Sequence, residues 1–400
     1  MSELGTNTDT NAGADATEAA VAAAAAAKYG LRHGHPDLKS IGPIAFGPDG
    51  ILFAADSTGA SVYAIHIGET TDSSPVNLDN LDTRLAGYLG CPREDVAIHG
   101  LAVHPSSHEV FLSIMRGTGA EAAPVIVRLD STGTLAEVPL DEALFARTTI
   151  ENAPAEDDDR TDIRVIPDNE GGEVLVVGNG TRLHITRSPL RSTTVTKLAY
   201  LDGLLLVAGS SNEEFSSTFR RIPFPFGSAG GEGGEGGEGG ESVANSLEIF
   251  HVSHGKYETA SPIRAFVPYG GNTSILASYT CTPVVHFSLT DLLSGTQARG
   301  RTVAELGPMN TPLDMVSYER DGQEYLLVSN ARHPLFKMAC SDIDKQEPLD
   351  TPHEPLGVPR QELPHPGVGL MANWNGSHIV MLQRDDASSL HLRSYATTEL

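Results

Sequence analysis

A set of polar residues, most of them placed directly after a short apolar run, marks where this chain could do chemistry. Each of these runs has the length of one strand. The set comprises Asp56, Arg116, Asn179, Asn212, Glu213, Glu214, Tyr279, Cys281, Asn330, Arg332, His333, Arg384 and Asp385. His99 belongs with them because it stands at the start of another apolar run. These residue types suit either a hard metal ion or a charged organic ligand.

The oxygen-bearing members of this set predict a metal site. Ca²⁺ and Mg²⁺ bind carboxylate and carbonyl oxygens. The candidate ligands are Asp56, Glu213, Glu214, Asn179 and Asn330. A metal ion held by them could polarise an ester carbonyl, which would leave His99 or His333 to transfer a proton. This interpretation predicts a hydrolase or a lyase with Ca²⁺ or Mg²⁺ as its cofactor.

The basic members of the set predict a different site. The planar guanidinium groups of Arg116, Arg332 and Arg384 suit a carboxylate or phosphate ligand. Further ligand contacts would come from Asn179, Asn212, Tyr279, Cys281 and Asn330. Cys281 could also be a nucleophile with His333 as its base, or an inert buried thiol. In a third interpretation, these polar turns contact water and hold no dedicated ligand.

The elements that position these residues are short strands in a repeated pattern. Residues 40–67 alternate strand, Asp-Gly turn, strand, polar turn and strand, which is an antiparallel meander. Such a meander cannot bury both faces alone, so it must stack on other copies. Six further meanders start near residues 98, 163, 195, 263, 312 and 367. The pattern predicts an all-β chain folded as a seven-bladed β-propeller of antiparallel meanders.

The pattern also divides the chain. Residues 1–38 are polar and Ala-rich and predict a disordered N-terminal tail, so the propeller would span 39–400. An insertion in blade four is expected at 209–246, with a disordered Gly/Glu-rich tether at 227–241. The segment Phe215–Phe226 before the tether is apolar enough to cover the channel mouth or to bind a protein partner.

Composition excludes several classes of function. The chain has 52 acidic and 27 basic residues, a formal charge of −25, and no basic cluster, which argues against nucleic acid as a partner. No apolar run approaches the roughly 20 residues of a membrane span. The sequence shows no signal peptide, so a soluble protein could be cytoplasmic or exported after removal of a signal.

The cysteines narrow the possibilities further. Cys91, Cys281 and Cys340 lack the spacing of a zinc ribbon, a thioredoxin-type pair or a haem attachment site. Their number is compatible with one disulfide and a free thiol or with three free thiols. Their usage therefore leaves both the disulfide state and the compartment open.

Three segments carry a resemblance to a known superfamily. GPIAFGPDGILFAAD at 42–56, GLAVHPSSHEVFLS at 100–113 and MVSYERDGQEYLLVSN at 315–330 resemble blades of the NHL, YVTN and gluconolactonase-like propellers. The resemblance implies a toroidal domain with a central channel. In such a domain the turn after each second strand reaches the channel mouth, so the polar residues above would gather there.

The resemblance does not decide the activity, because such propellers include lactonases, lyases, redox proteins and scaffolds. The acidic residues of the gluconolactonase-like metal site have no recognisable counterparts here. We therefore expect a propeller that binds a small polar or anionic ligand, or a partner, at the channel mouth. The alternative is a divalent-metal-dependent lactonase-type hydrolase or lyase that acts on a small polar substrate in the same channel.

Overall fold

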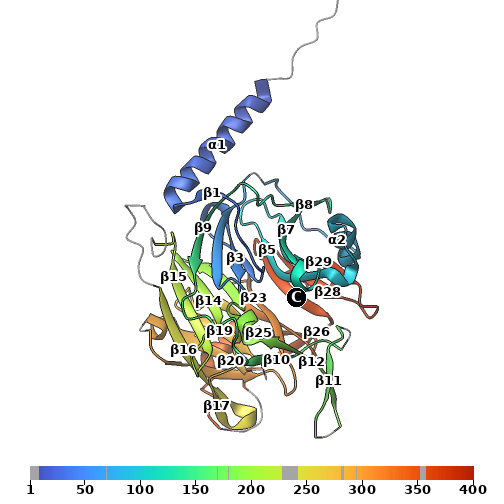
Figure 1. Cartoon of the computed structure of the whole chain (residues 1–400). Coiled ribbons are helices and arrows are strands. Elements are labelled where there is room, and N and C mark those ends of the chain that lie inside the picture. The colour runs from blue at the N-terminus through green and yellow to red at the C-terminus, as the bar shows by residue number, and fades with distance from the viewer. Residues whose placement is uncertain are drawn as a thin grey trace, which may run out of the picture.

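The computed structural model of the chain describes residues 9–68, 70–168, 170–178, 180–227, 242–280, 283–293, 295–351 and 357–400. Within these ranges the strands form seven sheets (Figure 1). Neighbouring strands are antiparallel except for one short parallel pair. The predicted all-β class is therefore confirmed.

The first sheet contains the three strands that the sequence predicts at 42–67. Asp49 and Gly50 both have positive φ, 50° and 71°, which is the turn geometry that an Asp-Gly pair favours. Two strands from elsewhere in the chain extend this sheet on one side. In sheet order the strands are β2 (Ile44–Phe46), β3 (Ile51–Asp56), β4 (Ser61–His66), β9 (Ala143–Thr149) and β1 (Arg32–Gly34).

Five other sheets begin with a three-stranded meander at or near the predicted place. The second sheet contains β5 (Val96–Val103), β6 (Val110–Arg116), β7 (Ala123–Leu129) and β8 (Leu135–Glu137). The third sheet contains β13 (Lys197–Leu201), β14 (Leu204–Ser210), β15 (Ser217–Pro223), β16 (Val243–His251) and β17 (Lys256–Glu258), with β21 (Ala298–Arg299) beside β16. The fourth sheet contains β18 (Ile263–Tyr269), β19 (Ser274–Tyr279), β20 (Pro283–Ser288) and β22 (Arg301–Glu305). The fifth contains β23 (Pro312–Arg320), β24 (Gln323–Asn330), β25 (Leu335–Ala339) and β26 (Gln361–Leu363). The sixth contains β27 (Val368–Trp374), β28 (His378–Arg384) and β29 (Leu390–Ala396).

These six sheets close a ring through their first strands. The order around the ring is β2, β5, β27, β23, β18 and β13. Each of these strands contacts the next, and β13 contacts β2. Apolar clusters fill the space between neighbours: Phe53 and Val207 share one cluster, and Leu112 and Val380 share another. Packing on both faces explains why second strands such as β3 are buried and apolar along their whole length.

The third predicted meander does not take a place in this ring. It forms a separate sheet of β10 (Thr161–Val165), β12 (Arg182–Pro189) and β11 (Glu173–Val176), which we call the cap sheet. The prediction of seven blades is therefore not confirmed within the described residues. The run of apolar residues in β11 resembles a buried second strand, but every residue of β11 is exposed. Run length alone cannot distinguish the two environments.

The cap sheet is attached to the ring by polar contacts. Asp162 of β10 forms an ion pair with Arg264 of β18, in which both side chains are buried. The backbone N–H of Val165 donates to Thr311 Oγ1 at 3.1 Å, next to β23. Glu170, in the turn between β10 and β11, pairs with Arg384 of β28. The cap sheet thus contacts three successive sheets of the ring.

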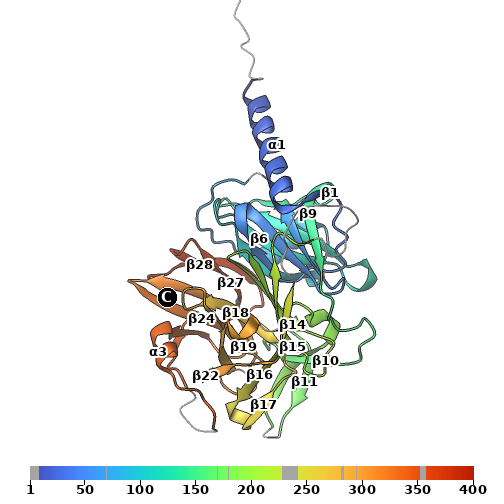
Figure 2. The same cartoon turned by 90° about the vertical axis from the view of Figure 1, so that its left-hand side faces the viewer.

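The N-terminal segment is not a disordered tail where the structure describes it. Residues 9–29 form helix α1 (Asp9–Tyr29), which projects from the body of the molecule (Figure 2). Its last turn is anchored, because the Tyr29 hydroxyl donates to Asp49 at 2.6 Å and its ring stacks on Phe224. Residues 1–8 lie outside the described residues. No helix of the described ranges is both long and apolar enough to cross a membrane.

The predicted insertion at 209–246 also contains structure that the sequence did not reveal. Strand β15 lies inside it, and Phe219 of this strand is fully buried. Phe224 and Phe226 pack against Phe53 of the first sheet, so the segment Phe215–Phe226 is part of the ring and not a lid. The predicted tether at 227–241 lies, apart from Gly227, outside the described residues.

Candidate ligand-binding site

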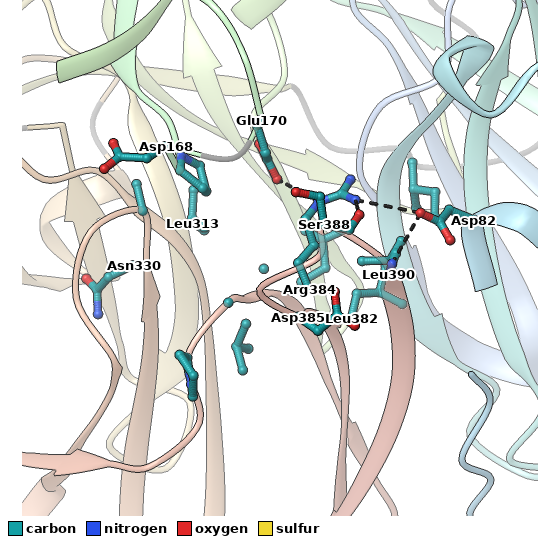
Figure 3. Close-up of a pocket in the computed structure, with 18 of the residues that line it drawn as sticks. Asp82, Asp168, Glu170, Leu313, Asn330, Leu382, Arg384, Asp385, Ser388 and Leu390 are labelled. Carbon is teal, nitrogen blue, oxygen red and sulfur yellow. Dashed lines mark hydrogen bonds and ion pairs between the residues drawn. The ribbon is translucent and has the colours of Figure 1, made fainter. Parts of the chain in front are cut away.

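A cavity of about 1030 Å³ opens between three neighbouring sheets of the ring, those that begin with β5, β27 and β23. We call it the mouth pocket. The turn between β10 and β11 of the cap sheet completes its lining (Figure 3). Apolar side chains form part of its wall, namely Val96, Ile98, Leu313, Val368, Leu370, Leu382 and Leu390.

One turn beside the pocket requires glycine. Gly367 has φ +71°, and a Cβ atom there would lie 2.2 Å from the backbone oxygen of Arg384. The close approach allows the Arg384 N–H to donate to the Gly367 carbonyl at 2.9 Å. This contact places Arg384 beside the start of β27, where its side chain faces the cavity (Figure 3).

Two acidic residues neutralise Arg384. Its Nε lies 3.1 Å from Glu170 Oε1, and its Nη1 lies 3.9 Å from Asp82 Oδ2. Asp82, in helix α2 (Leu81–Leu89), is 5% exposed and also pairs with Arg93 at 3.0 Å. Its Oδ2 further accepts the backbone N–H of Leu390 at 3.2 Å. Two of the guanidinium groups that line the pocket therefore already have carboxylate partners.

Three other carboxylates of the lining are exposed and have no hydrogen-bond or ion-pair partner among the described residues: Glu94, Asp168 and Asp386. Asp385 differs, because it accepts the N–H groups of its own turn and lies 3.2 Å from His391. The Ser389 N–H is the largest cause that lowers the pKa of Asp385, followed by His391.

The lining carries an excess of negative charge. Its carboxylates are Asp82, Glu94, Asp168, Glu170, Asp385 and Asp386, and its guanidinium groups are Arg93, Arg332 and Arg384. Burial lowers the pKa of His333, so its imidazole is neutral at neutral pH. Six carboxylates against three guanidinium groups leave a net charge of −3. The mouth pocket is therefore acidic at its rim and apolar on its walls.

Five of the predicted site residues line this pocket: Asn330, Arg332, His333, Arg384 and Asp385. The Asn330 amide has no free group, since Oδ1 accepts from Asn310 and Nδ2 donates to two backbone carbonyls. The ring of His333 stacks on Phe336, and its buried Nε2 has no hydrogen-bond partner within the described part of the chain. Asn330 thus maintains its loop and is not available as an oxygen ligand.

Asp56 has a structural role that its position in the sequence does not reveal. Its side chain is fully buried and accepts four hydrogen bonds, from Lys39 N, from Ser40 N and Oγ, and from Gly59 N, at 2.8–3.0 Å. All of these donors belong to turns at one end of the first sheet. The predicted role of Asp56 as a metal ligand is therefore not supported by its surroundings.

The remaining predicted residues do not meet at the pocket. Arg116 is exposed at the end of β6, and Tyr279 is buried in β19. Asn212, Glu213 and Glu214 lie after β14, where Arg160 donates to the Glu213 carbonyl. Asn179 and Cys281 lie outside the described residues. Within the described ranges no three His, Cys, Asp or Glu side chains are grouped to hold a metal ion.

His99 lies on β5 outside the lining of the mouth pocket. Its side chain is reached by solvent, yet desolvation lowers its pKa, and Arg164 of the cap sheet adds to this effect. The effect of Arg164 places His99 near the cap sheet. No hydrogen bond or ion pair joins its side chain to another described residue, so no general acid or nucleophile is paired with it there.

The sequence missed most of the acidic rim. Asp82, Glu94, Asp168 and Glu170 come from segments that precede strands, whereas the search for site residues followed second strands. Two charged runs mark parts of this rim: RED at 93–95, directly before β5, contains Glu94, and RDD at 384–386, at the end of β28, contains Asp385 and Asp386. Their proximity depends on β5 and β27 being neighbours in the ring.

No protein-family model and no curated protein matches the chain. Among solved structures it resembles β-propellers. They include a streptogramin B lyase, at 9% identity over 92% of this chain and 97% of that chain with a TM-score of 0.38. Virginiamycin B lyase from Staphylococcus aureus follows, at 11% identity over 91% and 98% with 0.37. The β-propeller domain of Cps50 from Myceliophteria thermophila matches at 10% identity over 89% and 84% with 0.36. At these values the likeness carries no inference about function.

Proposed function

We propose that this chain is a ligand-binding β-propeller with six blades, capped on one side by the cap sheet, and that its ligand occupies the mouth pocket. The ring of six contacting first strands supports the blade count. The size of the cavity supports the site, because ligand pockets commonly measure about 300–1,000 Å³. A cavity at the upper end of this range suits a drug-sized molecule or a few residues of a peptide.

The ligand we propose carries a positive charge beside an apolar portion. One observation carries this assignment: Glu94, Asp168 and Asp386 line the pocket and have no partner among the residues that the structure describes, while Arg93 and Arg384 are already paired. An ammonium or guanidinium group would gain charge-assisted hydrogen bonds from these carboxylates. The apolar part of the ligand would pack against Leu313, Leu370 and their neighbours, which gives affinity by burial of apolar surface.

An anionic ligand has less support than the sequence suggested. It would have to displace Glu170 or Asp82 from Arg384, and it would meet a lining of net negative charge. Arg332 is the one guanidinium of the pocket lining for which no carboxylate partner is found in the described part of the chain. The hydrolase or lyase alternative stays a prediction, with no group of described residues assembled to support it.

The test is a binding comparison between two matched tripeptides. Acetyl-Leu-Arg-Leu-amide presents a cation between apolar groups, and acetyl-Leu-Glu-Leu-amide presents an anion between the same apolar groups. Isothermal titration calorimetry with the full chain should detect binding of the arginine peptide, weaker at higher salt because the rim charges are exposed. Equal affinity for both peptides, or a preference for the glutamate peptide, would contradict the proposal.

Paired variants locate the binding site. Asp168→Asn removes one unpartnered carboxylate of the rim, so affinity for the arginine peptide should fall, roughly threefold to tenfold. Asp157→Asn removes an exposed carboxylate without a partner among the described residues and outside the pocket lining. This control should bind like the unchanged chain. An equal loss in both variants would mean that only the overall charge matters.

A further inference from the structure

Strand β11 of the cap sheet is an unprotected edge. It pairs with β12 and with no other described strand, and it projects from the body of the molecule (Figure 1). Three consecutive apolar side chains are exposed on it: Val174 at 39%, Leu175 at 37% and Val176 at 60%. Edge strands of stable monomers usually carry charges or proline that prevent pairing with another chain. Residues 174–177 contain neither.

The hydrogen-bond pattern shows which residues face the free edge. His184 of β12 uses its carbonyl to bind Ile166 on the β10 side, so its partner in β11, Val174, is not bonded to β12. Val177 N donates to Thr181 O at 3.0 Å, which agrees with the same alternation. Antiparallel strands bond through every second residue. Val174 and Val176 therefore direct both N–H and C=O groups outward, whereas Leu175 bonds to β12.

We propose that this edge pairs antiparallel with β11 of a second copy of the chain, centred on Leu175. In this register Val174 lies opposite the second copy's Val176, and the reverse pair forms by symmetry. Both pairs join outward-facing residues, so they make four backbone hydrogen bonds. A shift by one residue would place outward groups against inward ones. The outward-facing residues of β11 lie symmetrically on either side of Leu175. Two copies of the strand can therefore bond to each other across a twofold axis, as a twofold interface requires.

Charge permits contact at this hairpin. The chain carries −25 overall, so two copies repel each other. The hairpin of β11 and β12 has two arginines, Arg182 and Arg187, and one acidic residue, Glu173. In the proposed register Glu173 lies opposite Val177, so no like charges meet. Because the long-range repulsion is screened by salt, the dimer should tighten as ionic strength rises.

Sedimentation velocity of the full chain at increasing concentration tests the pairing. Val176→Pro removes an outward N–H and adds a ring at the free edge, yet it leaves the bonds to β12 intact. It should raise the dissociation constant of the dimer by about tenfold or more. Val176→Thr keeps the N–H and should dimerise like the unchanged chain. A chain that stays monomeric at high salt, or equal dimerisation of the Pro variant, would overturn the proposal.

A cross-linking experiment tests the register. Leu175 would face its own copy as a non-hydrogen-bonded pair, with Cα atoms about 4.5 Å apart. This distance suits a disulfide, so Leu175→Cys should form a covalent dimer on mild oxidation in a Cys91→Ser, Cys281→Ser background. Glu173→Cys lies opposite Val177 and should not. Equal cross-linking of both variants, or none of Leu175→Cys, would refute the register.

Discussion

Arg384 of β28 and Glu170 of the cap sheet lie 3.1 Å apart, Nε to Oε1, although 214 residues separate them in the chain. This ion pair joins the cap sheet to the ring at the mouth pocket (Figure 3). Asp82 approaches Arg384 from the other side, so the guanidinium is held between two carboxylates. The pair therefore contributes to the shape of the pocket and to its charge balance.

Replacing Glu170 by glutamine should affect binding more than stability. Exposed ion pairs contribute less than about 1 kcal/mol, so the free energy of unfolding should change little. The freed charge of Arg384 should weaken binding of the arginine tripeptide, roughly threefold to tenfold. Calorimetry and urea denaturation measure the two effects. Glu173→Gln breaks a similar exposed pair, with Arg187 at 3.0 Å, outside the pocket and should leave affinity unchanged.

The buried pair of Asp162 and Arg264 should be the main attachment of the cap sheet. Asp162→Ala leaves a buried guanidinium without its carboxylate, which costs about 3–5 kcal/mol in the free energy of unfolding. Loss of the cap contact should also raise the pKa of His99 towards its ordinary value, because desolvation is what lowers it. Urea denaturation and NMR titration of the His99 ring report the two changes.

A double variant separates the charge effect from simple damage at this site. Asp162→Leu with Arg264→Met removes both charges and fills the same space, so it should recover most of the lost stability. A single variant at Asp162 that unfolds no more easily than the unchanged chain would show that the pair does not hold the cap.

Acid should destabilise this chain through histidines whose pKa is lowered in the folded state. Partial desolvation lowers the pKa of His99, His104, His254, His286, His333 and His365 from the ordinary value of 6.5. Below pH 6.5 the unfolded chain binds more protons than the folded chain, so the free energy of unfolding falls as pH falls. Above pH 6.5 the contribution of these groups is constant.

Denaturation at several pH values between 5 and 8 measures this slope. His333→Gln should reduce the slope because it removes one of these titrating groups from the folded interior. A stability that is unchanged between pH 8 and pH 5 would contradict the prediction.

Asp56 should matter for stability and not for metal binding. Asp56→Asn places an amide group against backbone N–H donors, so we expect a loss of about 2–4 kcal/mol in the free energy of unfolding. Adding Ca²⁺ should not raise the melting temperature of either protein. A Ca²⁺-dependent increase that disappears in Asp56→Asn would instead restore the interpretation of Asp56 as a metal ligand.

The sequence by itself determined the all-β class and most of the strands. Turn signals such as Asp49-Gly50 and Asp202-Gly203, between apolar runs, act over a few residues, and both appear as turns with positive φ. The same local signals predicted the first three strands of several sheets. Local chemistry sufficed here because a turn and its two strands need no distant partner to be recognised.

Only the tertiary structure decided which strands share a ring and which residues share a pocket. Similar short apolar runs became the buried β14 in one place and the exposed β11 in another. Glu170 and Arg384 meet because the cap sheet lies against the last sheet of the chain. Asp56 became a buried acceptor for neighbouring turns instead of a ligand at a channel. The ring and the pocket depend on contacts between segments far apart in sequence, which no local pattern encodes.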